Sequence, residues 1–230
     1  MKNILYINGS PRGEGESTSG VILRDIHRIL VSDGPGHGEP DLLTLPVQKG
    51  RREEEILRRM DEADAWVIAF PLYIFALPGH LTWWLMRYEE YRTRGGACRP
   101  IRIYAAANCG FPEPSHCRSA LTVIRLFCRR NGLDWRLGIA MGKGEPYKQM
   151  KDMPLTSRMK SGILEAYKTL AADMAAETPA AGDIFPVSLR MPDSLYRLMG
   201  TVGWKLRIRK SGLKGKDLHA RPLLTPPARV

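Results

Sequence analysis

The chain has 230 residues, of which 43% are hydrophobic and 26% are charged, a composition typical of one globular domain with a substantial core and an appendage. No stretch approaches the ~20 apolar residues that a membrane helix needs, and no signal-peptide block precedes the first strand pattern, so we expect a cytoplasmic protein. The four cysteines contain no C-x-x-C pair. We therefore expect reduced thiols, without a disulfide framework or a metal site.

The net charge of +11 is concentrated toward the C-terminus. Residues 186–230 hold ten Lys and Arg residues against Asp193 and Asp217, whereas the rest of the chain is close to balance. This asymmetry indicates a basic segment attached to a nearly neutral body. We predict a domain over residues 1–178 and a basic, partly helical extension over residues 179–230.

The first apolar run, residues 4–7, is typical of a strand buried on both faces, and a helical pattern begins at Val21. Between them the chain reads GSPRGEGESTS, so Ser17, Thr18 and Ser19 lie where the helix should begin. Amides and hydroxyls at a helix N-terminus suit a phosphate. The alternative is an ordinary turn with an ordinary helix cap. The loop matches neither the P-loop nor the G-x-G-x-x-G fingerprint, which argues against ATP hydrolysis and classical dinucleotide binding.

The remaining elements alternate along the chain. Strands are expected over residues 4–7, 41–45, 65–70, 99–107 and 135–141. Helices are expected from residue 21 and over residues 51–63, 78–91, 116–131 and 160–176. This alternation predicts an α/β protein whose parallel sheet carries helices on both faces, joined by right-handed crossovers. Five strands favour a flavodoxin-like doubly wound sheet.

Three strand-to-helix loops should open at one edge of this sheet, where ligands bind near the switch in strand order. The first loop is suited to an anion, the second (PLYIFALPG) is aromatic and apolar, and the third (NCGFPE) contains glycine and offers backbone groups. Together they suit a ligand with a phosphate tail and a flat heteroaromatic head. The simplest such ligand is FMN.

The motifs NGSPR followed by STS, PLYIFALPGHL followed by an aromatic helix, and NCGFPE resemble those of the flavodoxin-like NAD(P)H-dependent FMN reductase family. The resemblance covers roughly residues 1–175 in order and spacing. It also extends to the C-terminal segment, which is similar to that of some family members in having a tryptophan-containing basic helix before SGLKGKDLHARP.

The resemblance implies three groups of cofactor-binding residues. The FMN phosphate is expected among Ser10, Arg12, Ser17, Thr18 and Ser19. The isoalloxazine ring is expected against Pro71, Leu72, Tyr73, Ile74 and Phe75 on one side, and against Asn108, Cys109, Gly110 and Phe111 on the other. Two alternatives stay open, namely that Arg12 is a solvated surface residue and that Phe75 belongs to the core.

FMN accepts hydride and passes electrons onward, so the protein has mainly to bind, orient and adjust charge, and we name no catalytic residue. The predicted function is an FMN-dependent oxidoreductase that uses NADH or NADPH to reduce a small acceptor such as a quinone, a flavin or a nitroaromatic compound. The alternative is a non-catalytic electron carrier of the flavodoxin type. Such carriers are typically shorter and acidic, which does not match this chain.

The basic tail allows a further alternative, a module that binds anionic partners. Its apolar residues, Trp204 and its cations are compatible with a helix at a membrane interface. We favour instead packing of Trp204 and the leucines on the domain or on a second subunit, with the charges in water. A homodimer is therefore expected. No nucleic-acid-binding motif accompanies the charge, so nucleic acid is not an expected partner.

Overall fold

A computed structural model describes residues 3–12, 17–31, 39–47, 52–95, 99–176, 183–215 and 217. The chain divides into two compact units, residues 1–190 and residues 191–230. The first unit holds one sheet and most of the helices. The second contains the helix α7 (Asp193–Lys210).

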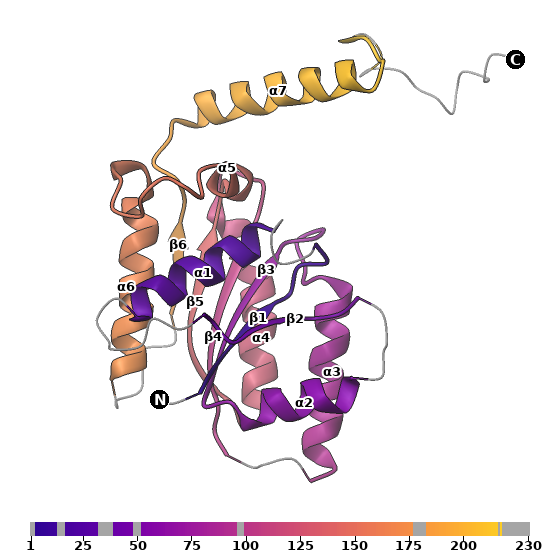
Figure 1. Ribbon diagram of the computed structural model, residues 1–230, viewed down its shortest axis with the longest axis vertical. Coiled ribbons are helices and arrows are strands. Elements are labelled where there is room, and N and C mark those ends of the chain that lie inside the picture. The colour runs from indigo at the N-terminus through magenta and orange to yellow at the C-terminus, as the bar shows by residue number, and fades with distance from the viewer. Residues whose placement is uncertain are drawn as a thin grey trace, which may run out of the picture. The chain divides into compact units, whose positions relative to one another are not determined.

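The first unit is built on a six-stranded sheet in which every neighbouring pair of strands is parallel (Figure 1). The strand order is β2-β1-β3-β4-β5-β6, which reverses direction at β1 and β3. The strands are β1 (Ile4–Asn8), β2 (Leu42–Thr44), β3 (Ala65–Pro71), β4 (Arg102–Asn108), β5 (Asp134–Met141) and β6 (Ile184–Val187). The first five are the predicted strands, with bounds shifted by a few residues at most.

The predicted count of five strands is wrong, because β6 adds a sixth. This strand has only four residues, pairs with β5 alone and contains Pro186. A proline lacks the backbone N–H that a central strand needs, so proline-containing strands lie at sheet edges. The short apolar run therefore resembled part of the extension rather than a strand.

Helices cover both faces of the sheet, as the alternating pattern predicted. The helices are α1 (Thr18–Val31), α2 (Glu53–Glu62), α3 (Gly79–Thr93), α4 (Arg118–Arg130), α5 (Gly144–Gln149) and α6 (Ser161–Ala175), with short 3₁₀ helices η1 (Pro114–Cys117) and η2 (Arg158–Lys160). Buried residues of α2, α3 and α4 share one apolar cluster, and those of α1, α5 and α6 share another. Alternate residues of β1, β3 and β4 enter the two clusters, because successive strand side chains point to opposite faces.

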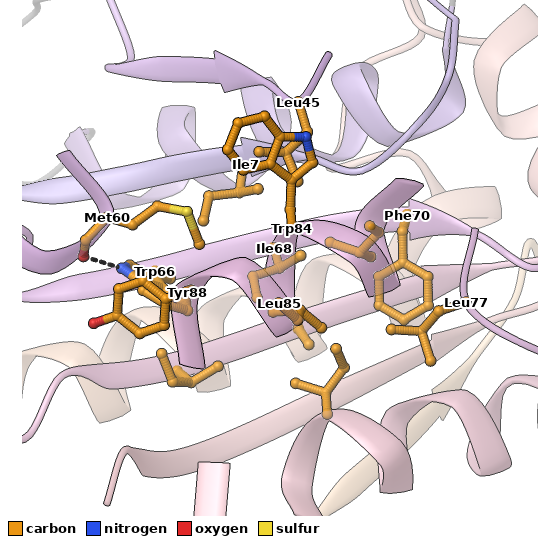
Figure 2. Close-up of a cluster of buried hydrophobic side chains, with 14 of the residues drawn as sticks. Ile7, Leu45, Met60, Trp66, Ile68, Phe70, Leu77, Trp84, Leu85 and Tyr88 are labelled. Carbon is orange, nitrogen blue, oxygen red and sulfur yellow. Dashed lines mark hydrogen bonds between the residues drawn. The ribbon is translucent and has the colours of Figure 1, made fainter. Parts of the chain in front are cut away.

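The cluster beneath α2 and α3 is rich in aromatic side chains (Figure 2). Trp66 on β3 is fully buried and donates its indole N–H to the Met60 carbonyl oxygen at 2.7 Å, while its ring meets Tyr88 edge-on. Trp84 on α3 likewise donates to the Pro46 carbonyl oxygen at 3.0 Å. The buried rings therefore keep their polar atoms bonded and hold α2 and α3 in position under the sheet.

A glycine sits where β1 leaves this packed layer. Gly9 donates its amide to the Ala69 carbonyl oxygen at 2.8 Å, and a Cβ at Gly9 would lie 2.9 Å from Leu81 Cδ2 and 3.0 Å from Phe70 Cβ. A larger residue would push the first loop away from β3. The glycine therefore keeps the loops after β1 and β3 close to each other.

The second unit contains an 18-residue helix, α7, whose side chains are at least partly exposed throughout. Arg207 lies over the Trp204 ring, with 5.7 Å between the guanidinium carbon and the ring centroid. No helix among the described residues has both the length and the apolar character needed to cross a membrane.

Candidate functional site

The loops after β1, β3 and β4 meet at the carboxyl edge of the sheet, beside the reversal in strand order. In doubly wound sheets this position collects ligands, because neighbouring loops diverge there. The parallel registers of β1 with β3 and of β3 with β4 bring the three loops to the same edge. The predicted convergence of these loops is therefore confirmed.

Ser17 caps the N-terminus of α1. Its Oγ accepts a hydrogen bond from the Gly20 amide at 3.0 Å and a second from Asn8 Nδ2 at 3.3 Å. Helix geometry leaves the first amides without intrahelical acceptors, so the amides of Thr18 and Ser19 add to the positive end of the helix. The Ser17 oxygen is used as an acceptor, which leaves its hydroxyl hydrogen to be donated to a ligand.

Asn8 and Asn108, at the ends of β1 and β4, hold the start of α1 and the neighbouring loops in place through hydrogen bonds. Asn8 Oδ1 accepts the Ser10 amide at 3.0 Å, which fixes the turn after β1. Asn108 Nδ2 donates to Ser19 Oγ at 3.0 Å and to the Phe70 carbonyl oxygen at 2.9 Å. Both asparagines are buried, so α1, β3 and β4 are tied together by satisfied polar groups in a low-dielectric setting.

The loop after β5 is a fourth loop at this edge of the sheet. Lys143 donates its amide to the Phe111 carbonyl oxygen at 2.8 Å, and Gly144 donates to that of Cys109 at 2.8 Å. Thr18 Oγ1 in turn donates to the Gly144 carbonyl oxygen at 3.3 Å. The loop therefore links the loop after β4 to the start of α1.

These loops enclose a pocket of about 160 Å³ at the sheet edge. Its lining consists of Ser10, Arg12, Ser17, Thr18, Ser19, Pro71, Leu72, Tyr73, Asn108, Cys109, Gly110 and Glu145. Eleven of these twelve residues are among the predicted cofactor-binding residues. Ile74, Phe75 and Phe111, which were predicted with them, lie in the same loops but outside the lining.

Glu145 and Asn8 are the members of the site that sequence reasoning missed. Glu145 follows β5, and the rule that brings the other loops to the carboxyl edge applies equally to this one. Asn8 was considered only within the alternative of an ordinary turn. Its position at the end of a buried strand was the available signal, since a buried amide side chain needs partners.

The loop after β3 carries a tight turn at its tip. Tyr73 and Ala76 exchange two backbone hydrogen bonds of 3.0 and 2.9 Å, and the residues between them, Ile74 and Phe75, have φ values of 48° and 60°. Left-handed backbone costs roughly 1–2 kcal/mol per residue for side chains other than glycine. Ile74 is 96% exposed, so no packing of its side chain within the described structure explains this strain.

Aromatic rings join the loops after β3 and β4. Phe75 stacks on Phe111 with centroids 5.6 Å apart and planes 14° apart. His116 lies beside both rings, with centroid distances of 5.3 and 4.7 Å. Phe75 therefore contacts another loop rather than the sheet core, and both phenylalanines stay substantially exposed at the edge of the site.

The comparisons with known proteins agree with this architecture. The family model described as "Flavodoxin-like fold" matches residues 2–93. The chain has a flavodoxin-like fold. The resemblance inferred from the three loops is therefore confirmed for the flavodoxin-like fold. No curated protein sequence matches the chain.

Three solved structures are similar to this chain in fold. An NADPH-quinone reductase from P. pentosaceus is 13% identical, and the match covers 74% of this chain and 97% of that one with a TM-score of 0.52. An NADH:FMN oxidoreductase in its apo form is 15% identical over 84% of this chain and 97% of that one, with a TM-score of 0.53. An FMN-dependent NADH-azoreductase from Bacillus anthracis str. Ames Ancestor, in complex with FMN, is 15% identical over 73% of this chain and 99% of that one, with a TM-score of 0.53.

The contact between the loops after β4 and β5 gives a stability prediction for the flavodoxin-like domain. A Cβ at Gly142 would lie 2.4 Å from the Pro112 carbonyl oxygen, a backbone atom that cannot rotate away. We expect Gly142→Ala to lower the free energy of unfolding by about 1–3 kcal/mol. Gly110→Ala is the matched control, because its Cβ would meet no atom within 4 Å. Equal denaturation midpoints for the two variants would contradict the close approach.

The strained turn gives a second prediction. Replacing Ile74 and Phe75 by Asn and Gly, which suit two successive positive φ values, should raise the free energy of unfolding by about 1 kcal/mol. The gain is smaller than the relieved strain because the Phe75–Phe111 stack is lost. Chemical denaturation of the double variant checks this. Asn–Gly at 91 and 92 within α3 is the matched control and should destabilise, and a loss of stability at the turn would contradict the reading of its strain.

Proposed function

We propose that the chain is an oxidoreductase that binds FMN in this pocket and uses NADH or NADPH to reduce a small acceptor. One observation carries the proposal. The pocket places a hydroxyl-rich helix N-terminus beside an apolar, aromatic loop and a glycine-containing loop, at the reversal in strand order. That arrangement matches a ligand with an anionic end and a flat aromatic end.

The phosphate end would meet Ser17 and Ser19. The oxygen of each hydroxyl already accepts a hydrogen bond within the protein, so each hydroxyl hydrogen is left for an anionic oxygen. Thr18 differs, because its hydroxyl donates to the Gly144 carbonyl oxygen. The exposed Arg12 would add a charge-assisted contact, and its amide is already held by Ser10 Oγ at 3.3 Å.

The ring end would lie between the loops after β3 and β4. Pro71, Leu72 and Tyr73 line the pocket on one side, and Cys109 and Gly110 line it on the other. A Cβ at Gly110 would meet no protein atom, so nothing in the fold itself requires a glycine there. A flat ligand lying against this backbone supplies a reason for it.

When bound, FMN supplies hydride acceptance and onward electron transfer. The residues of this chain bind the phosphate, orient the ring and limit its contact with water. Tyr73 and the stacked Phe75 and Phe111 would present aromatic surface to a flat acceptor such as a quinone, a free flavin or a nitroaromatic compound. No protein acid or nucleophile is required, and we assign no catalytic residue.

The activity is tested with the purified full-length chain loaded with FMN. We expect oxidation of NADH or NADPH, followed at 340 nm, to be accelerated by a soluble quinone well beyond the rate given by free FMN at the same concentration. The chain without flavin is the control and should be inactive. Failure to retain any flavin would overturn the proposal. Flavin retention with no turnover would instead favour an electron carrier.

The phosphate assignment predicts unequal effects of neighbouring hydroxyls. Ser17→Ala removes a hydrogen bond to a charged group, worth about 1.5–3 kcal/mol, so FMN affinity should fall at least about tenfold. Thr18→Val keeps the side-chain shape and removes a hydroxyl that is already donated to Gly144. We expect less than about a threefold loss from it.

Riboflavin separates the phosphate contribution from general damage. It has the ring and lacks the phosphate, so Ser17→Ala should weaken its binding far less than that of FMN. Fluorescence titration of both ligands into wild-type and variant apoprotein gives the comparison. An equal loss for riboflavin and FMN, or no loss for either, would refute the assignment of this loop.

A further inference from the structure

Two cysteines lie together under the loop that follows β4. Cys109 begins this loop and Cys117 ends η1. The Cys109 amide donates to the Met141 carbonyl oxygen at 2.9 Å, and Cys117 Sγ lies 3.8 Å from the same oxygen. Each thiol also changes the pKa of the other, as neighbouring groups do. One acceptor on β5 therefore holds both residues side by side.

The segment between the cysteines folds back over the sulfur of the first. Cys109 Sγ lies 3.8 Å from the Phe111 carbonyl oxygen and 3.9 Å from that of Glu113. The loop is therefore already closed around the pair. A disulfide forms only between residues that are held close together, and the shared Met141 carbonyl oxygen keeps Cys109 and Cys117 close.

The two thiols differ in acidity. The neighbouring Cys117 lowers the pKa of Cys109, whereas the neighbouring Cys109 and burial raise the pKa of Cys117. Burial also raises the pKa of Cys128, on α4, to about 12. Among the cysteines in the described ranges, Cys109 is therefore the one with the greatest thiolate character, and thiolates are the reactive form.

The two thiols also differ in access. Cys109 lines the pocket and is 5% exposed, while Cys117 and Cys128 are both 0% exposed. A small reagent that enters the pocket would meet Cys109 first. Cys117 lies behind it, in the position of a resolving thiol.

We propose that Cys109 and Cys117 form a redox-active dithiol that reduces a small hydroperoxide and closes to an intramolecular disulfide. Cys109 borders the proposed flavin pocket, but the reaction itself needs no flavin, so the proposal does not rest on a bound flavin. Its substrate class is a peroxide small enough to enter the pocket, of which hydrogen peroxide is the simplest.

The chemistry balances in two steps. The Cys109 thiolate attacks one oxygen of the peroxide, the O–O bond breaks, and the leaving oxygen departs as water or an alcohol after taking a proton, which leaves Cys109 as a sulfenic acid. Cys117 sulfur then attacks Cys109 Sγ, the S–O bond breaks, and the hydroxyl leaves as water with the proton from Cys117. The two thiols lose two electrons, and the peroxide gains them.

The test uses the purified full-length chain freed of flavin, reduced, desalted and exposed to hydrogen peroxide. We expect the mass to fall by two hydrogens and peptide mapping to join Cys109 to Cys117. The thiol of Cys109 should disappear at least about tenfold faster than that of Cys128. Cys128→Ala is the matched control, because it removes another buried free thiol and should leave the new disulfide unchanged.

Two variants isolate the order of the steps. Cys117→Ala should accumulate a sulfenic acid at Cys109, trapped by dimedone, because the resolving thiol is missing. Cys109→Ala should leave Cys117 unreacted. Circular dichroism confirms that each variant is folded, and Ser in place of Ala gives a second version of any variant that is not. A disulfide between other cysteines, equal reactivity of Cys109 and Cys128, or no oxidation at all would overturn the proposal.

Discussion

The pocket depends on one buried side chain, the amide of Asn108. Its Nδ2 donates both to Ser19 Oγ on α1 and to the Phe70 carbonyl oxygen on β3. Because Asn108 itself ends β4, this single group joins the three elements whose loops form the pocket. A buried amide left without partners costs about 1–3 kcal/mol, so the three elements are held in the one arrangement that satisfies it.

The polar residues at the start of α1 and the exposed turn at Ile74 and Phe75 have opposite effects on the stability of the pocket. Asn8 donates to Ser17 Oγ and Asn108 donates to Ser19 Oγ, which keeps the phosphate side rigid before any ligand arrives. The turn at Ile74 and Phe75 holds unfavourable backbone angles and shows apolar surface to water. Strain of this kind persists where surrounding structure enforces it, and it gathers at sites of function. The stable core built on Trp66 and Trp84 offsets the cost.

The fold could be predicted from the sequence because the patterns that indicate strands and helices are local. Apolar runs mark the first five strands, and the rules for parallel sheets bring their loops to one edge. The strand β6 was missed because Pro186 lies within its short apolar run and weakens the strand pattern. The sequence could not show that Thr18 donates to Gly144, because the two are 126 residues apart and no local pattern links them. The contact of Phe75 with Phe111 escaped prediction for the same reason.

The most direct test of the central claim is a crystal structure of the full-length chain with FMN. We expect phosphate oxygens within hydrogen-bond distance of the Ser17 and Ser19 hydroxyls, with Thr18 still donating to the Gly144 carbonyl oxygen. We also expect the ring between Tyr73 and Gly110. A phosphate bound elsewhere, or a flavin whose ring lies away from the loops after β3 and β4, would contradict the claim.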